Sequence, residues 1–88
     1  MPKFIAVHTI PIPWTKEQWM NVLKQELPVP KGVSWNLSYC DFKDGKIFCE
    51  WDAPNKEIIE RGLKAIYLPV DAIYPVEVFN VAKKKFEG

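Results

Sequence analysis

The sequence has one histidine, one arginine and two cysteines among its 88 residues, so few side chains are available for catalysis or metal binding. The single arginine, Arg61, lies in the middle of a segment with helical periodicity, and no phosphate-cradling loop follows the first apolar segment. No apolar run approaches the roughly 20 residues that a bilayer span requires, so we expect no membrane contact. The net charge is only +1, which gives no general field to attract nucleic acid.

The start of the chain also lacks the marks of a secretory signal. MPKFIAVH contains one lysine and then alternating apolar residues, without an apolar core or a small-residue cleavage site. We therefore expect a cytoplasmic protein. Because the cytosol keeps thiols reduced, we expect Cys40 and Cys49 to be free thiols rather than a disulfide.

What the chain does contain is alternation in some segments and helical spacing in others. Alternating or branched apolar residues predict strands over residues 3–9, 33–41, 46–52 and 72–80. Helical spacing follows Thr15, which forms a capping-box pattern with Gln18, and a second helix is predicted after Asn55. In the first helix the predicted buried stripe is Trp19, Met20, Leu23 and Leu27, and in the second it is Ile58, Ile59, Leu63 and Ile66.

This order of strand, helix, strand, strand, helix, strand predicts a ferredoxin-like α+β sandwich. Both helices then cover one face of a four-stranded antiparallel sheet, and residues 33–41 and 72–80 form its outer strands. Pro75 supports the second assignment, because proline has no amide for a central ladder. The chain is expected to form a single domain over residues 1–88, with residues 1–2 and 83–88 frayed.

A sheet with helices on one face leaves its other face open, and we expect that face to form a homodimer. Hydrophobicity assigns Ile5 and Val7 to the helix side of the first strand. Phe4, Ala6 and His8 then lie on the open side. In the third strand, Ile47, Cys49 and Trp51 are predicted to face the helices, and Phe48 and Glu50 the open side.

The turn at Asp44–Gly45 decides the position of Cys40. A two-residue turn would pair Cys40 with Cys49, whereas a three-residue loop with Gly45 in a bulge would place Cys40 beside Phe48. We favour the bulge because it sends Val33, Trp35, Leu37 and Tyr39 to the helix side.

In that register His8 and Cys40 lie at one end of the open face, with Glu50 further along the third strand. Imidazole and thiolate suit nickel, zinc or copper, and strands two spacings apart, roughly 10 Å, would just allow a shared ion. Each residue also has a simpler interpretation. His8 is equally well explained as a hydrogen-bonded strand histidine or as an acid or base, and Cys49 as a small buried apolar residue. The tryptophans are expected in the core and at the dimer interface.

Five segments carry a resemblance to a known family: FIAVH (residues 4–8), TKEQ (15–18), WNLSYCD (35–41), GKIFCEWDAP (45–54) and DAIYPVE (71–77). Together they make the chain similar to a family of small ferredoxin-like proteins, some described as nickel-binding and many without a known function. The resemblance implies an α+β sandwich that dimerises through its open sheet, with metal ligands at positions matching His8 and Cys40. Members commonly have a further histidine late in the second helix. This chain has none there, so additional ligands would come from Glu50, Asp41 or a second subunit.

Three functional hypotheses follow, and whether the protein is an enzyme stays open among them. The first is a module that binds nickel or another divalent transition metal through His8, Cys40 and Glu50. The second is a dimeric α/β-barrel that binds a small molecule or acts as an enzyme, with His8 as acid or base. The third is a structural or regulatory dimer without metal. Nucleic-acid binding is not expected, because Phe48 stands beside Glu50 rather than among basic residues.

Overall fold

The computed structural model describes residues 1–11 and 14–87. Residues 12, 13 and 88 lie outside this description, including the last residue of the tail that was expected to fray. The elements are β1 (Lys3–Thr9), α1 (Lys16–Val22), β2 (Ser34–Asp41), β3 (Lys46–Asp52), α2 (Lys56–Ala65), β4 (Ala72–Val76), β5 (Phe79–Asn80) and β6 (Lys85–Phe86).

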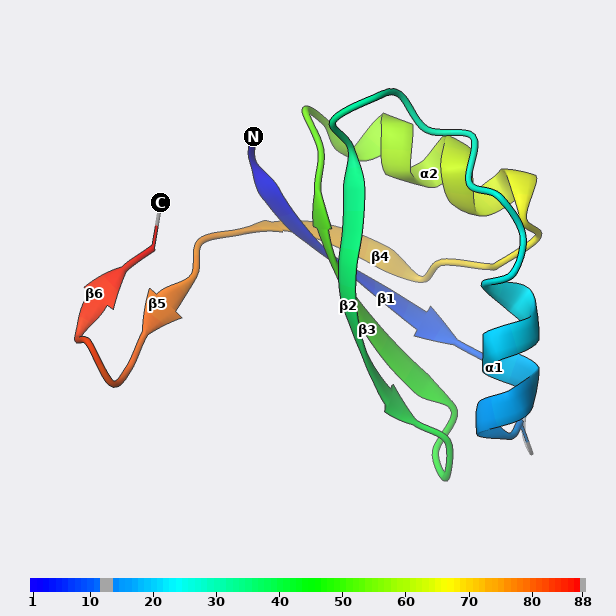
Figure 1. Ribbon diagram of the computed structural model, residues 1–88. Coiled ribbons are helices and arrows are strands. Elements are labelled where there is room, and N and C mark those ends of the chain that lie inside the picture. The colour runs from blue at the N-terminus through cyan, green and yellow to red at the C-terminus, as the bar shows by residue number, and fades with distance from the viewer. Residues whose placement is uncertain (12–13, 88) are drawn as a thin grey trace.

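The main sheet has the strand order β2-β3-β1-β4, and its neighbouring strands are antiparallel. The outer strands are therefore β2 and β4, as predicted, and the edge position of β4 accommodates Pro75. Figure 1 shows α1 and α2 on the same side of this sheet. The fold is an α+β sandwich compatible with the ferredoxin-like plan.

Both helices begin where the capping residues predicted. The Thr15 hydroxyl accepts a hydrogen bond from the Gln18 amide at 3.1 Å, and the Gln18 side chain accepts one from the Thr15 amide at 2.8 Å. The α1 helix ends at Val22, however, so Leu23 and Leu27 of the predicted stripe lie beyond it, and Met20 is exposed instead of buried. The Asn55 side chain caps α2 by accepting from the Ile58 amide at 3.1 Å.

The side-chain directions of β3 were predicted correctly, whereas those of β1 were not. Ile47, Cys49 and Trp51 are fully buried beneath the helices. The β1 residues that pair with them are Phe4, Ala6 and His8, and these three face the core instead of the open side. Hydrophobicity cannot distinguish the faces of β1, because residues 4–7 are all apolar. Pairing with β3, in which burial alternates from residue to residue, decides the direction.

The predicted register of the β2–β3 hairpin was also wrong. Asp41 pairs with Lys46 across a loop of residues 42–45, which places Cys40 opposite Ile47. The Asp41 carboxylate stabilises this longer loop by accepting hydrogen bonds from the backbone amides of Lys43 and Asp44, both at 3.1 Å.

The irregularity in β2 lies at Asn36, between Trp35 and Leu37, and not at Gly45. It reverses the alternation along β2, as a bulge does. Trp35 therefore faces the helices as predicted, and Leu37 and Tyr39 lie with Glu50 and Phe48 on the open face.

The C-terminal segment forms a small hairpin instead of a continuous strand to Asn80 and a frayed tail. The β5 and β6 strands pair through Phe79 with Phe86 and Asn80 with Lys85. The Phe79 and Phe86 rings meet edge to face, with centroids 5.0 Å apart.

Candidate functional site

The side chain of His8 is fully buried near the end of β1, on the helix side of the sheet. Its Nδ1 atom lies 2.8 Å from the carbonyl oxygen of Pro69, and since a carbonyl only accepts, Nδ1 carries the proton. In this tautomer the Nε2 atom carries a lone pair that can accept a hydrogen bond. The atom is buried and has no hydrogen-bond partner among the described residues. Burial lowers the pKa of His8, because it disfavours the imidazolium form.

His8 belongs to a cluster of aromatic side chains. Its ring stacks on Trp35 at a centroid distance of 6.5 Å, and Trp35 stacks on Trp51 at 4.9 Å. Trp19 meets Trp35 edge to face at 6.0 Å. His8 is thus surrounded by core aromatics, and its burial matches the interpretation as a strand histidine hydrogen-bonded to a neighbour.

Cys40 and Cys49 are free thiols on the helix side of the sheet, in different environments. Cys49 is fully buried, and burial raises its pKa to about 12 although the Ser38 hydroxyl bonds its Sγ at 3.2 Å. Cys40 is exposed, and partial burial of its thiol still raises its pKa. The interpretation of Cys49 as a buried apolar residue agrees with this position.

His8 and Cys40 both occupy positions opposite Ile47, one on each neighbouring strand. They were expected at the same end of one face, and they are, but that face is the one beneath the helices. The fully buried side chain of Ile47 stands between them instead of Phe48.

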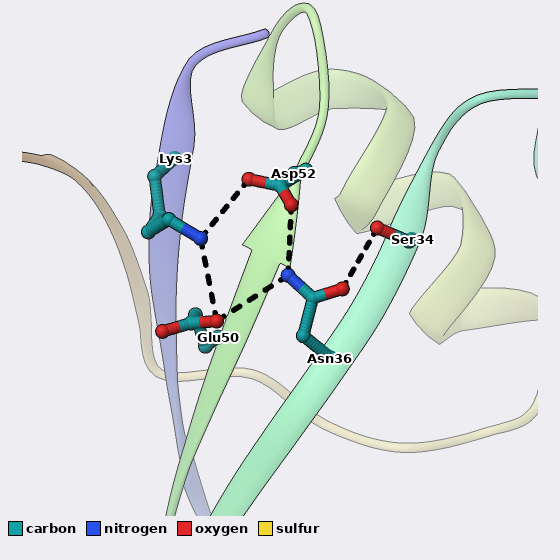
Figure 2. Close-up of polar contacts among 5 residues, drawn as sticks. All are labelled: Lys3, Ser34, Asn36, Glu50 and Asp52. Carbon is teal, nitrogen blue, oxygen red and sulfur yellow. Dashed lines mark hydrogen bonds and ion pairs between the residues drawn. The ribbon is translucent and has the colours of Figure 1, made fainter. Parts of the chain in front are cut away.

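Glu50 lies on the opposite face from His8 and Cys40, where it takes part in a polar cluster at one end of the open face. Figure 2 shows this cluster. The Lys3 ammonium lies 3.3 Å from Glu50 and 3.2 Å from Asp52. The Asn36 amide donates to Asp52 at 2.8 Å and to Glu50 at 3.3 Å. These hydrogen bonds, first from Asn36 and then from Lys3, lower the pKa of Asp52.

A second polar cluster closes the other end of the open face. The Lys46 ammonium lies 2.6 Å from the Thr9 hydroxyl and 3.8 Å from the Asp71 carboxylate. The Thr9 hydroxyl in turn donates a hydrogen bond to Asp71.

Between the two clusters runs an apolar band, which we call the open-face band. Its members share the open side of the four strands and are Ile5, Val7, Leu37, Tyr39, Phe48 and Tyr74. Four of them are well exposed: Leu37 by 53%, Tyr39 by 61%, Phe48 by 41% and Tyr74 by 56%. Only Phe48 was placed on this face from the sequence. The others could not be placed on this face from the sequence, because residues 4–7 of β1 are all apolar and the bulge in β2 reverses its alternation.

The three predicted ligands do not form a metal site within one subunit. His8 and Cys40 are on one face and Glu50 on the other, and Ile47 separates the first two. Within residues 1–11 and 14–87, no three side chains of the His, Cys, Asp or Glu type are grouped to hold an ion. The Nε2 atom of His8, which has no hydrogen-bond partner among the described residues, could coordinate a metal ion, but a single imidazole cannot complete a site. Within the part of the chain that the structure describes, His8, Cys40 and Glu50 of one subunit are therefore not arranged to share a nickel ion.

The two largest cavities described are not lined by His8. One, of about 380 Å³, lies between the end of α2 and the start of β4 and includes Leu63, Pro69 and Asp71 in its lining. The other, of about 320 Å³, lies beside Trp35 and Leu37. A substrate bound in either cavity would therefore not contact the His8 ring, as proton transfer requires.

Among the described residues, neither helix has the length and apolar character to cross a bilayer.

Comparison with known proteins agrees with this fold. The chain is similar to a crystal structure of SCO4226 from Streptomyces coelicolor A3(2), with a TM-score of 0.74 and 25% sequence identity. The similarity covers 84% of this chain and 94% of that one. A comparison with curated proteins gave no match. The model of the family described as nickel responsive protein SCO4226-like matches residues 4–76, and the chain belongs to this family.

Proposed function

We propose that this protein is a nickel-responsive module that acts as a homodimer joined through the open-face band. The observation that carries the proposal is the band itself. Leu37, Tyr39, Phe48 and Tyr74 are exposed on one face of the sheet while the helices cover the other. An exposed apolar surface with polar rims is typical of a protein interface, and a small domain gains stability by covering it.

The polar clusters at the two ends of the band suit a twofold interface. Lys3 and Lys46 are each paired with carboxylates inside their own subunit, so neither ammonium reaches the rim of the band unpaired. Like charges facing each other across an interface would otherwise oppose association. A second copy of the same face therefore meets no unpaired ammonium at these two positions.

The nickel part of the proposal rests on the family, and the structure adds a condition to it. One subunit gathers no three suitable side chains among its described residues, so we propose that nickel binding needs the dimer. Twofold symmetry doubles the ligands available at an interface. Of the three candidate ligands, Glu50 lies on the face that meets the partner, and Cys40 is exposed at the end of β2. Nickel accepts both carboxylate oxygen and thiolate sulfur.

The experiment measures association and nickel uptake together. Sedimentation velocity and equilibrium dialysis against Ni(II) are performed on the unaltered protein, on Phe48→Glu and on Met20→Glu. Phe48→Glu adds a charge to the open-face band, whereas Met20→Glu adds the same charge at an exposed apolar residue on α1. We expect the unaltered protein and Met20→Glu to dimerise and bind nickel in a fixed ratio to the dimer. Phe48→Glu should be monomeric and bind none.

Two results would contradict parts of this proposal separately. If the unaltered protein is monomeric at high concentration, the proposed homodimer is wrong. If Phe48→Glu takes up as much nickel as the unaltered protein, nickel binding does not require the dimer. Glu50→Gln and Cys40→Ser then locate the ligands, because loss of uptake in the first places them at the interface and in the second at the end of β2.

A dimer that takes up no nickel is the alternative of a structural or regulatory protein. The interpretation of His8 as an acid or base is not favoured, since its ring is fully buried and lines neither large cavity. We place the protein in the cytoplasm, where its two free thiols stay reduced.

A further inference from the structure

The β5–β6 hairpin, with the residues that lead into it, forms an arm over residues 77–87 that lies outside the family domain. The family match ends at residue 76. The buried core and the hydrophobic side chains packed against it include no residue of the arm. The domain is therefore complete without the arm.

The arm is ordered by its own hydrogen bonds. Asn80 accepts from the Lys83 amide at 2.9 Å and donates to the Glu87 carboxylate at 2.8 Å. The Glu87 amide donates to the carbonyl of Val78 at 2.7 Å. Lys84 takes a positive φ of 54°, which a tight turn between the strands requires. These contacts shape the hairpin, but they bury no side chain.

The apolar side chains of the arm are uncovered. Phe79 is 46% exposed, Val81 77% and Phe86 63%. A two-stranded hairpin with two paired residues in each strand is marginal in water by itself. An aromatic pair that leaves about half of its surface exposed gains only part of the stabilisation of full burial, so a covering surface is needed to make this hairpin stable.

The arm projects away from the rest of the molecule. Figure 1 shows β5 and β6 beyond the end of β4, on the far side of the sheet from α1 and α2. The radius of gyration is 13.6 Å. A compact domain of this length would have a radius of gyration of about 12 Å, so the arm extends the molecule.

The base of the arm lies at one end of the open-face band. A cavity there is lined by residues of both termini, among them Lys3, Val76, Val78 and Glu87. The segment from residue 77 to residue 82 reaches roughly 20 Å when extended, at about 3.3 Å per residue. Stacked sheets lie about 10 Å apart, and four strands span about 15 Å. The arm is long enough to cross from one sheet to the face or edge of another.

We propose that this arm clasps a second copy of the same chain, with Phe79 and Phe86 packed against the partner's open-face band. This inference rests on the proposed homodimer and specifies how it is held. One chain carries both an uncovered apolar arm and an uncovered apolar face, so a twofold pair covers two arms and two faces at once. The charges also complement each other. Three exposed lysines lie near the tip, at positions 83, 84 and 85, and the cluster of Lys3, Glu50 and Asp52 beside the band has one more carboxylate than ammonium.

The test combines a variant series with a direct measurement on the unaltered protein. Dissociation constants of the full chain are determined by sedimentation equilibrium for Phe86→Ser and for Met20→Ser as the matched control. We expect Phe86→Ser to weaken the dimer about tenfold or more, which corresponds to about 1.4 kcal/mol, because it truncates a buried interface aromatic. Met20→Ser should leave the constant unchanged.

In a dimer mixed from isotopically labelled and unlabelled chains, filtered nuclear Overhauser spectra detect contacts between subunits only. The expected contacts join the rings of Phe79 and Phe86 to methyl groups of Leu37 or Val7 in the other chain. A dimer that forms without such contacts and tolerates Phe86→Ser overturns the arm and leaves the homodimer standing. A chain that stays monomeric overturns both.

Discussion

The imidazole of His8 donates a hydrogen bond to the carbonyl oxygen of Pro69 over 2.8 Å, which ties the end of β1 to the segment that leads into β4. These residues are 61 positions apart in the chain. The bond fixes the tautomer of a fully buried histidine and holds the ring parallel to Trp35 within 24°. The hydrogen bond therefore bears on the free energy of unfolding rather than on catalysis.

The free energy of unfolding should fall as the pH decreases from about 7 to 5. Burial lowers the pKa of His8 below 6.5, and the Pro69 bond and Asp71 oppose this shift only in part. Between the two pKa values the unfolded chain binds more protons than the folded one, so stability is complete above about pH 6.5 and declines below it. Urea unfolding at pH 7.0 and at about pH 5.5 measures the difference.

His8→Phe provides the control for this pH dependence. It should remove most of the slope between about pH 7 and 5, while the unpaired Pro69 carbonyl lowers stability at all pH values by about 1–3 kcal/mol. An equal slope in the variant would show that another group is responsible. Asp52 cannot be that group, because its pKa is lowered from 3.8 and its contribution is lost only in more acidic solution.

The two thiols should differ sharply in reactivity. Cys40 is exposed, whereas Cys49 is fully buried with a pKa raised to about 12, and only the thiolate is nucleophilic. At pH 8 a disulfide reagent should modify one thiol per folded chain rapidly and the second only after unfolding. Cys40→Ser should abolish the rapid phase, and Cys49→Ser should preserve it. Rapid modification of both thiols would contradict the burial of Cys49.

A side chain at Gly62 should collide with the segment between α1 and β2. A Cβ atom at this position would lie 3.0 Å from a methyl carbon of Val29 and 3.2 Å from one of Leu27. We expect Gly62→Leu to destabilise the protein by about 1–3 kcal/mol through overpacking. The neighbouring exposed position offers a control, and Arg61→Leu should change stability by less than about 0.5 kcal/mol. Similar values for both variants would mean that the segment moves aside freely.

The bulge residue Asn36 should set the pKa of Asp52. Its amide hydrogen bond at 2.8 Å is the largest cause of the lowered pKa, ahead of the Lys3 ion pair. Asn36→Ala should therefore raise the pKa of Asp52 toward its ordinary value, as followed by carboxyl carbon chemical shifts in a pH titration. Ser34→Ala removes a neighbour of Asn36 and should have a smaller effect. An unchanged pKa in Asn36→Ala would assign the shift to Lys3 alone.

The candidate site shows where sequence reasoning stops. His8 and Cys40 were expected as neighbours at one end of one face, and they share that end and that face. The face itself was wrong, because a shift of one residue in the β2 register and a reversed β1 turned both side chains under the helices. Glu50 lies on the open side as predicted, so it does not share a face with His8 and Cys40.

The order of elements from β1 to β4, the edge position of β4 and the caps at Thr15 and Asn55 could all be predicted from the sequence. Each depends on local chemistry: a missing amide, a capping oxygen or an apolar period. In β3 the apolar residues Ile47, Cys49 and Trp51 recur at every second position, which predicted the buried face although Phe48 is also apolar.

Only the tertiary structure decided which faces β1 and β2 present. In β1 the apolar run of residues 4–7 gives both faces equal hydrophobicity, so its direction follows from pairing with β3. In β2 the reversal occurs at Asn36, whose amide donates hydrogen bonds to Glu50 and Asp52 of β3, and Lys3 of β1 pairs with the same two carboxylates. Such contacts join residues far apart in sequence. They bury the side chain of His8 and leave the open-face band exposed to solvent.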